Sequence, residues 1–157
     1  MASLASRLRA AGIGSHFAGQ PVALAQRRGA LALHRNVFDR LPGEGRWGAV
    51  VLLDGNIGIG GDPVRLLARC SALAGAGGAI LAEVEGTGSI RRTQARVERG
   101  AERGPWFAWA TVGVGAISRV AAAAGVRLIR FNAVGDGRVL AVLACPESEP
   151  DALACGA

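Results

Sequence analysis

Residues 47–84 constrain the fold more than any other part of the sequence. The run WGAVVLL at 47–53 is almost continuously apolar, which is typical of a strand buried on both faces of a sheet. A glycine-rich segment follows, and then Asp62-Pro63 favours the start of a helix, because Asp caps helices and Pro fits their first turn. After a glycine stop comes a second apolar run, AILAEV at 79–84. Strand, helix and strand within about 38 residues predict a parallel crossover unit.

The flanking segments extend this pattern. Pro21 opens a predicted helix over 22–28, and an apolar run at 30–34 follows its glycine stop. The apolar runs 126–131 and 138–144 flank Asp136-Gly137, a dipeptide typical of hairpin turns, so these strands are expected to be antiparallel. We therefore predict an α/β fold: a Rossmann-like, mostly parallel sheet with helices on both faces and a C-terminal antiparallel hairpin. A chain of 157 residues suits a single domain, expected over 1–146, with 147–157 as a flexible tail.

The charge is strongly basic and is carried by one residue type. All 18 basic residues are arginine, the net charge is +6, and the pI is about 11.1. Such a balance is typical of nucleic-acid binding, but a coding bias toward Arg, Ala and Gly would raise the pI equally, and the sequence favours the bias. No stretch approaches the roughly 18 apolar residues of a membrane span, and no signal-peptide core follows Arg7 and Arg9. We expect a cytoplasmic protein without membrane association.

The cysteines and histidines indicate no metal site. Cys70, Cys145 and Cys155 lack the close spacing of zinc ligands, and an odd count gives no disulfide framework. Cys70 falls within the predicted helix after Pro63 and is expected to be a small buried apolar residue. His16 and His34 stand apart from one another.

In α/β folds of this kind, ligands bind at the carboxyl ends of the strands. This places the expected site at Asn36, at 54–61 and at 83–87, with 14–17 as a further candidate segment. The glycines of 54–61 are compatible with a phosphate loop, but Gly61-Asp62 stands where Lys and then Ser or Thr are needed, and an acidic cap repels phosphate. The sequence therefore does not favour a phosphate site there.

Several of these segments, taken in order, resemble class I S-adenosylmethionine-dependent methyltransferases. Residues 47–54, 61–67 and 75–83 are similar to the fourth strand, the following helix and the fifth strand of that family, and 36–39 to the segment after its third strand. The resemblance implies S-adenosylmethionine as cofactor and a small-molecule methyl acceptor. It also implies that Asn36 and Val37 face the adenine, and that Asp54, Gly55 and Asn56 line the place where methyl group and acceptor meet. Methyl transfer needs orientation more than a dedicated base, which fits the lack of a catalytic triad pattern.

The resemblance has two departures. The family's cofactor site rests on a glycine-rich loop after its first strand, and no such strand or loop precedes Ser3. The acidic residue that ends the family's second strand is replaced by Gly14 or His16, depending on the alignment. We therefore expect an N-terminally shortened methyltransferase-like domain, whose activity depends on what the missing loop would contribute. The alternative is a non-catalytic remnant that binds partners through its Arg-rich surface or self-associates through an unpaired sheet edge.

Two further clusters have a structural and a functional interpretation. Trp106, Phe107 and Trp109 could form an apolar wall for a substrate, or could simply cover the sheet, which the sequence slightly favours. The arginines between 91 and 103 could hold an anionic substrate or nucleic acid. Glu98 and Glu102, however, lie at helical spacing from neighbouring arginines, so a solvated charged face is the favoured interpretation. Glu83 is expected to be structural.

Overall fold

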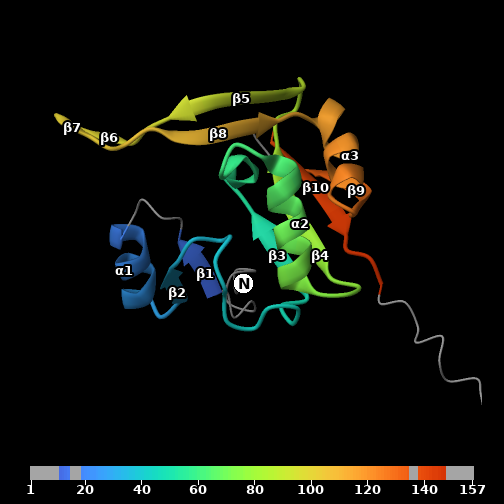
Figure 1. Ribbon diagram of the computed structural model, residues 1–157, viewed down its shortest axis with the longest axis horizontal. Helices are drawn as coiled ribbons and strands as arrows, with labels where there is room; N and C mark the ends of the chain where they lie inside the picture. Colours follow the sequence, from blue (N-terminus) through green and yellow to red (C-terminus); the bar gives the residue numbers. More distant parts are fainter. Residues whose placement is uncertain (1–10, 15–18, 135–137, 148–157) are drawn as a thin grey trace, which may run out of the picture. The chain divides into compact units, whose positions relative to one another are not determined.

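The computed structural model describes residues 11–14, 19–134 and 138–147 (Figure 1). Its contacts divide the chain into two units, which meet in the sequence between Pro42 and Gly43. The expectation of a single domain over 1–146 therefore stays a prediction, and each unit is described by itself. The tail expected at 147–157 lies, apart from its first residue, outside the described residues.

The N-terminal unit is a small parallel crossover. Strand β1 (Ala11–Gly14) pairs with β2 (Leu31–His34) in parallel, and helix α1 (Gly19–Arg27) connects the two strands. Gly29, with φ of 81°, turns the chain out of α1 toward β2. The Gln26 side chain donates a hydrogen bond of 2.9 Å from Nε2 to the Ala32 carbonyl, which ties the helix to the strand. The predicted helix and second strand are confirmed within a few residues of their expected bounds.

The C-terminal unit is built on a four-stranded mixed sheet of order β3-β4-β10-β9. Its members are β3 (Ala49–Leu52), β4 (Ala79–Val84), β9 (Arg127–Ala133) and β10 (Val139–Ala144). The pair β3 and β4 is parallel, whereas β10 runs antiparallel to both β4 and β9. The α/β class, the parallel crossover and the closing antiparallel hairpin are therefore confirmed, and the sheet as a whole is mixed. The Asp136-Gly137 turn itself lies outside the described residues.

Helix α2 (Pro63–Ala74) connects β3 to β4 and begins as the sequence predicts. One Asp62 Oδ1 accepts hydrogen bonds from the backbone N–H groups of Val64 and Arg65, at 3.1 and 3.2 Å. The apolar stripe of the helix is fully buried; it comprises Leu66, Leu67, Cys70 and Leu73. Gly75 ends the helix with φ of 85°, and a Cβ at this position would lie 2.2 Å from the Gly45 carbonyl oxygen.

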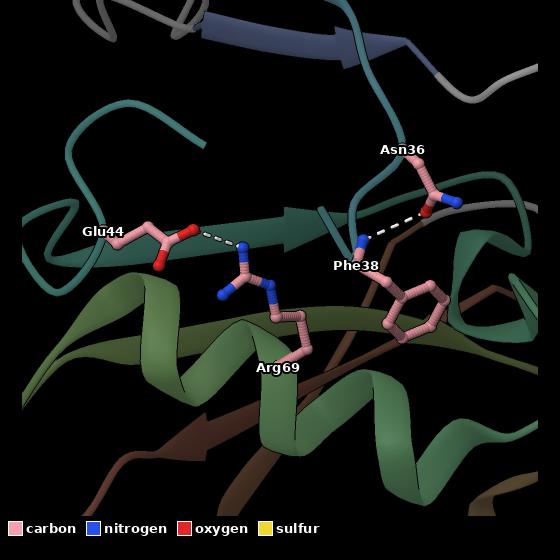
Figure 2. A network of polar contacts seen from close by, with 4 residues as sticks. All are labelled: Asn36, Phe38, Glu44 and Arg69. Carbon is pink, nitrogen blue, oxygen red and sulfur yellow. Dashed lines mark hydrogen bonds and ion pairs between the residues drawn. The ribbon is translucent and has the colours of Figure 1, made fainter. Parts of the chain in front are cut away.

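An ion pair outside the sheet fastens α2 to the segment before β3. Figure 2 shows the Arg69 guanidinium reaching the carboxylate of Glu44, with 2.5 Å between Nη2 and Oε1. The Arg69 side chain is 17% exposed and that of Glu44 is 37% exposed, so water reaches the carboxylate more than the guanidinium. The ion pair fixes the chain just before it enters the sheet.

Helix α3 (Val114–Ala123) packs against β9 and β10, and also against α2. Its buried side chains are Ala116, Ile117, Val120 and Ala121. Both helices therefore cover the same face of the sheet as Leu52, Ile80 and Ala141. No helix among the described residues is long and apolar enough to cross a membrane.

Strand β3 is less buried than its sequence predicts. Val51 is 47% exposed and Leu53 is 44% exposed, although the run at 47–53 is typical of a strand covered on both faces. The physical reason is position: β3 is an edge strand of the described sheet, and α2 and α3 cover only the face to which Leu52 belongs. The expectation of burial on both faces is therefore wrong for this strand.

The polar segment after β4 folds as a long antiparallel ribbon. Strand β5 (Ile90–Ala95) pairs with β8 (Phe107–Val112), and the short strands β6 (Glu98–Arg99) and β7 (Glu102–Arg103) continue the pairing toward the tip (Figure 1). The helical spacing inferred for Glu98 and the nearby arginines is therefore wrong. Glu98 instead pairs with Arg96 and, across the ribbon, with Arg103. The conformation is decided by the pairing of β5 with β8, whose partners run from Ile90 and Val112 to Ala95 and Phe107 and are set by no local pattern.

We expect alkaline pH to destabilise the protein through Cys70. Burial, with a smaller effect of the neighbouring Cys145, raises the pKa of the Cys70 thiol from 9.0 to about 12. Between these two pKa values, the thiol of the unfolded chain has released a proton that the thiol of the folded chain keeps. The free energy of unfolding should therefore fall by roughly 1.4 kcal/mol per pH unit above pH 9, and this group should cause no loss below it.

Urea unfolding at successive pH values across this window measures the slope. The sequence has no lysine and no tyrosine, so the two side chains that usually titrate here do not obscure it. Cys70→Ala is the control, because it removes the titrating group whatever its effect on absolute stability. An equal slope in Cys70→Ala and the parent protein would contradict the prediction.

Candidate functional site

Three charged side chains meet where the parallel strands of the C-terminal unit end. Asp54 follows β3, Glu83 lies near the end of β4, and Arg138 directly precedes β10, which runs the opposite way. Arg138 Nη1 lies 3.6 Å from Glu83 Oε2 and 3.8 Å from Asp54 Oδ1. The Asp54 backbone N–H also donates a hydrogen bond of 3.4 Å to Glu83 Oε2. Two carboxylates thus share one guanidinium, which leaves a net negative charge at the strand ends.

These three groups differ in their exposure to solvent. The Asp54 side chain is 84% exposed, that of Arg138 is 49% exposed, and that of Glu83 only 16% exposed. Glu83 is therefore the fixed member, held between the Asp54 backbone and Arg138. The Asp54 carboxylate points into solvent and is available to a ligand.

Asp54 also has an unusual backbone conformation. Among the described residues it alone has a positive φ without being a glycine, at 54°, and Gly55 follows with φ of 74°. Two successive left-handed residues turn the chain sharply from β3 into the short 3-10 helix η2 (Asn56–Gly58). Left-handed conformations cost free energy in residues with a side chain and are concentrated at functional sites. The left-handed conformation of Asp54 therefore costs backbone free energy at the ends of the parallel strands.

The glycines after this turn make room for strand β8. A Cβ at Gly58 would lie 1.9 Å from the Ala110 carbonyl oxygen and 2.9 Å from the Trp109 indole nitrogen. A Cβ at Gly61 would lie 2.8 Å from the Ala108 Cβ. Ile59 and Trp109 form a backbone bridge at the same place. The glycine-rich loop thus serves close packing of the ribbon, which accounts for glycines that do not match a phosphate-binding pattern.

This packing brings predicted site residues from distant segments together. The Trp109 ring lies against the loop, 4.0 Å from the position of a Cβ on Gly55. Phe107 meets Trp109 edge to face, with 5.9 Å between ring centroids. Asn56 is exposed at the start of η2. Trp106 lies farther along the ribbon, 61% exposed, beneath the Arg96 guanidinium.

The remaining predicted residues, Asn36 and Val37, belong to the N-terminal unit. They follow β2, as expected, and both are half-buried. The Asn36 Oδ1 accepts a hydrogen bond of 3.0 Å from the Phe38 N–H, which closes a side-chain turn (Figure 2). The amide of Asn36 thus shapes the chain directly after the strand.

The sequence did not single out Arg138, and it assigned Glu83 a structural role. Glu83 does hold the Asp54 backbone, but it also completes the charged cluster. The signal for Arg138 was its place at the start of a strand predicted to be antiparallel. Only the register of β10 on β4, with Leu140 opposite Glu83, brings its guanidinium to the strand ends.

A depression elsewhere in this unit is lined by few polar or charged side chains. It is lined mainly by small or apolar residues at the C-terminal ends of α2 and α3, together with Ser71 and Glu147. Gly75 and Pro146 place it at the end of the sheet opposite Asp54. The strand-end cluster is therefore the better candidate site.

Comparison with known proteins supports the fold through similar structures, but finds no family through the sequence. No protein-family model matches the sequence, and no curated protein matches it. Solved structures do match. A methyltransferase from Bacteroides fragilis, in complex with S-adenosyl-L-homocysteine, superposes with a TM-score of 0.67 at 19% identity, covering 87% of this chain and 62% of that chain.

Two further structures give the same result. An N1-methyltransferase from Burkholderia thailandensis, with bound 1,6-didemethyltoxoflavin and S-adenosylhomocysteine, has a TM-score of 0.57 at 17% identity, over 88% of this chain and 62% of its own. An amino pentose methyltransferase from Micromonospora echinaspora, with S-adenosylmethionine bound, has a TM-score of 0.59 at 19% identity. The match covers 90% of this chain and 76% of that chain. The chain thus spans 62% of the length of the Bacteroides fragilis and Burkholderia thailandensis proteins. These likenesses confirm the predicted fold, that of class I methyltransferases.

We expect Asp54→Gly to leave the protein as stable as the parent or to stabilise it by up to about 1 kcal/mol. Glycine removes the steric cost of the left-handed conformation, and its larger entropy in the unfolded chain offsets part of the gain. Asp54→Ala should instead destabilise by about 1 kcal/mol, because alanine adopts the left-handed conformation less readily than aspartate does. Both variants lose the exposed carboxylate, so their difference isolates the backbone effect. Urea unfolding measures it, and equal stabilities would contradict the assignment of strain.

Proposed function

We propose that this chain belongs to a methyltransferase that uses S-adenosylmethionine to methylate a small-molecule acceptor. The observation that carries the proposal is the cluster of Asp54, Glu83 and Arg138 at the carboxyl ends of β3 and β4, in a fold whose solved examples include complexes with this cofactor or its product. Carboxyl ends of parallel strands are the usual place for ligands in α/β sheets.

The charge of this place fits the cofactor. When bound, S-adenosylmethionine supplies a methyl group on a positively charged sulfur, and the two carboxylates with one guanidinium offer a net negative charge. Asp54, Gly55 and Asn56 would hold it along the turn after β3. Asn36 and Val37, after β2, would face its adenine, as the resemblance implies.

The acceptor would lie against the aromatic side of the same turn. Trp109 packs on Gly55 and Gly58, and Phe107 packs edge to face on Trp109, so the two rings form an apolar wall next to the strand ends. Trp106 would extend this wall along the ribbon. Solved methyltransferases of this fold hold 1,6-didemethyltoxoflavin or 1,4-dihydroxy-2-naphthoic acid, which are flat ring compounds of the kind that aromatic walls bind.

The residues of this site would act mainly by orientation. Methyl transfer proceeds in line, so most of its rate comes from holding the acceptor atom at the correct distance and angle. The Asp54 carboxylate, 84% exposed, would accept a hydrogen bond from the N–H or O–H of the acceptor and take up its proton. Glu83 and Arg138 would keep Asp54 in place.

The second candidate is a non-catalytic module that binds partners through the Arg-rich ribbon. The observation that favours it is the exposure of the ribbon's arginines, with side chains of Arg91 and Arg103 73% and 68% exposed. A module of this kind would bind no S-adenosylmethionine. The two candidates are therefore separated by a single titration.

Isothermal titration with S-adenosylmethionine and S-adenosylhomocysteine tests the proposal. We expect saturable binding of both, and a weakening of at least about tenfold for S-adenosylmethionine in Asp54→Asn, which keeps size and turn propensity but removes the charge. The neutral sulfur of S-adenosylhomocysteine should make it less sensitive to this substitution.

Glu147→Gln is the matched control, because it removes one carboxylate near the opposite end of the sheet. Its affinity for both ligands should equal that of the parent protein. The absence of both binding heat and a thermal shift at millimolar ligand would overturn the proposal for this chain. The non-catalytic module would then remain.

A further inference from the structure

The ribbon formed by β5, β6, β7 and β8 is the most basic surface element of the C-terminal unit. Residues 90–106 contain five arginines and two glutamates: Arg91, Arg92, Arg96, Arg99 and Arg103, with Glu98 and Glu102. Neighbouring residues on a strand point to opposite faces, so Arg91 and Arg92 make both faces of the ribbon basic. In the ribbon, Glu98 and Glu102 do not lie at helical spacing from the arginines, so they are not placed to neutralise them all.

The acidic residues neutralise only part of this charge. Glu98 accepts a hydrogen bond of 2.6 Å from Arg96 Nε, while Arg103 approaches the same carboxylate at only 4.0 Å. Arg91 lies 3.8 Å from Glu85, and both side chains are more than half exposed. Arg92 forms no ion pair with any described residue. Exposed pairs at such distances contribute little free energy, so these arginines exchange readily to an external anion.

An aromatic ring stands among these arginines. Trp106 is 61% exposed, an unusual degree for tryptophan, and the Arg96 guanidinium carbon lies 4.6 Å from the centroid of its ring. Glu98 holds Arg96 by the short hydrogen bond, so the guanidinium and the indole form a supported platform. A flat ring with a guanidinium beside it is suited to stacking with an unpaired base.

We propose that the ribbon binds single-stranded nucleic acid. Its arginines would contact successive phosphates, and Trp106 would stack on one base. Charge complementarity selects a polyanion, and the exposed ring selects one with unpaired bases over a duplex, in which the bases are already stacked. This inference does not depend on methyl transfer, although it uses Trp106, which also extends the aromatic wall proposed for the acceptor.

Fluorescence anisotropy with a labelled RNA of about 12 nucleotides, and with DNA of the same sequence, tests the proposal. Measured between about 50 mM and about 200 mM NaCl, the logarithm of the affinity should fall linearly with the logarithm of salt concentration. The double variant Arg91→Gln/Arg92→Gln should reduce this slope by about 0.7, since a single strand on either face of the ribbon contacts one of these two arginines, and each phosphate contact contributes about 0.7. Trp106→Ala should weaken binding between about 5-fold and about 100-fold, with the slope unchanged.

The double variant Arg119→Gln/Arg127→Gln is the matched control, because it removes two exposed arginines from α3 and β9 and leaves the ribbon intact. Its slope should equal that of the parent protein. Equal binding of RNA and DNA would indicate recognition of phosphate and base alone, whereas tighter binding of RNA would add the 2′-hydroxyl; both support the proposal.

Three outcomes would overturn it. The first is no binding of either strand at about 100 µM protein in low salt. The second is an equal loss of slope in the control variant, which would show a general effect of net charge. The third is equal competition by polyglutamate of the same charge, which would identify an acidic polypeptide as the partner. Circular dichroism of each variant checks that it folds.

Discussion

The burial of one face of α2 is the constraint on which the C-terminal unit depends. Leu66, Leu67, Cys70 and Leu73 are fully buried between the sheet and α3, and removing such side chains from water supplies most of the free energy of folding. The helix can lie there only if it starts and ends at fixed residues. Asp62 sets the start through two hydrogen bonds, and Gly75 sets the end because the Gly45 carbonyl leaves no space for a side chain.

This placement of α2 determines where the charged and aromatic groups lie. The chain passes from the end of β3 at Leu52 to Asp62 through the left-handed turn at Asp54 and Gly55. The same short connection carries the glycines on which β8 packs. The root of the ribbon is held in turn by backbone hydrogen bonds of Glu85 with Val112 and Val114, at 2.9 and 3.0 Å. Carboxylates and aromatic rings are thus parts of one packed junction.

The sequence predicted what local patterns encode and missed what distant pairing decides. The cap at Asp62, the stop at Gly75 and the bounds of β4 follow from residue types within one or two turns, and all three are as predicted. The strand end at Asp54 was predicted for the same reason. The ribbon was not, because the partner of Arg91 is Thr111, far along the chain. Arg138 was missed likewise, since its place depends on how β10 pairs with β4.

Gly58 has a consequence for the register of the ribbon. The loop admits β8 only where a carbonyl oxygen can occupy the space that a side chain would fill, and Ala110 provides it. A slip by one residue would turn every side chain of β8 to the opposite face, so Trp109 would exchange places with its alanine neighbours. The absence of a side chain at Gly58 thus allows one register of β8 and determines the face of the ribbon on which Trp109 lies.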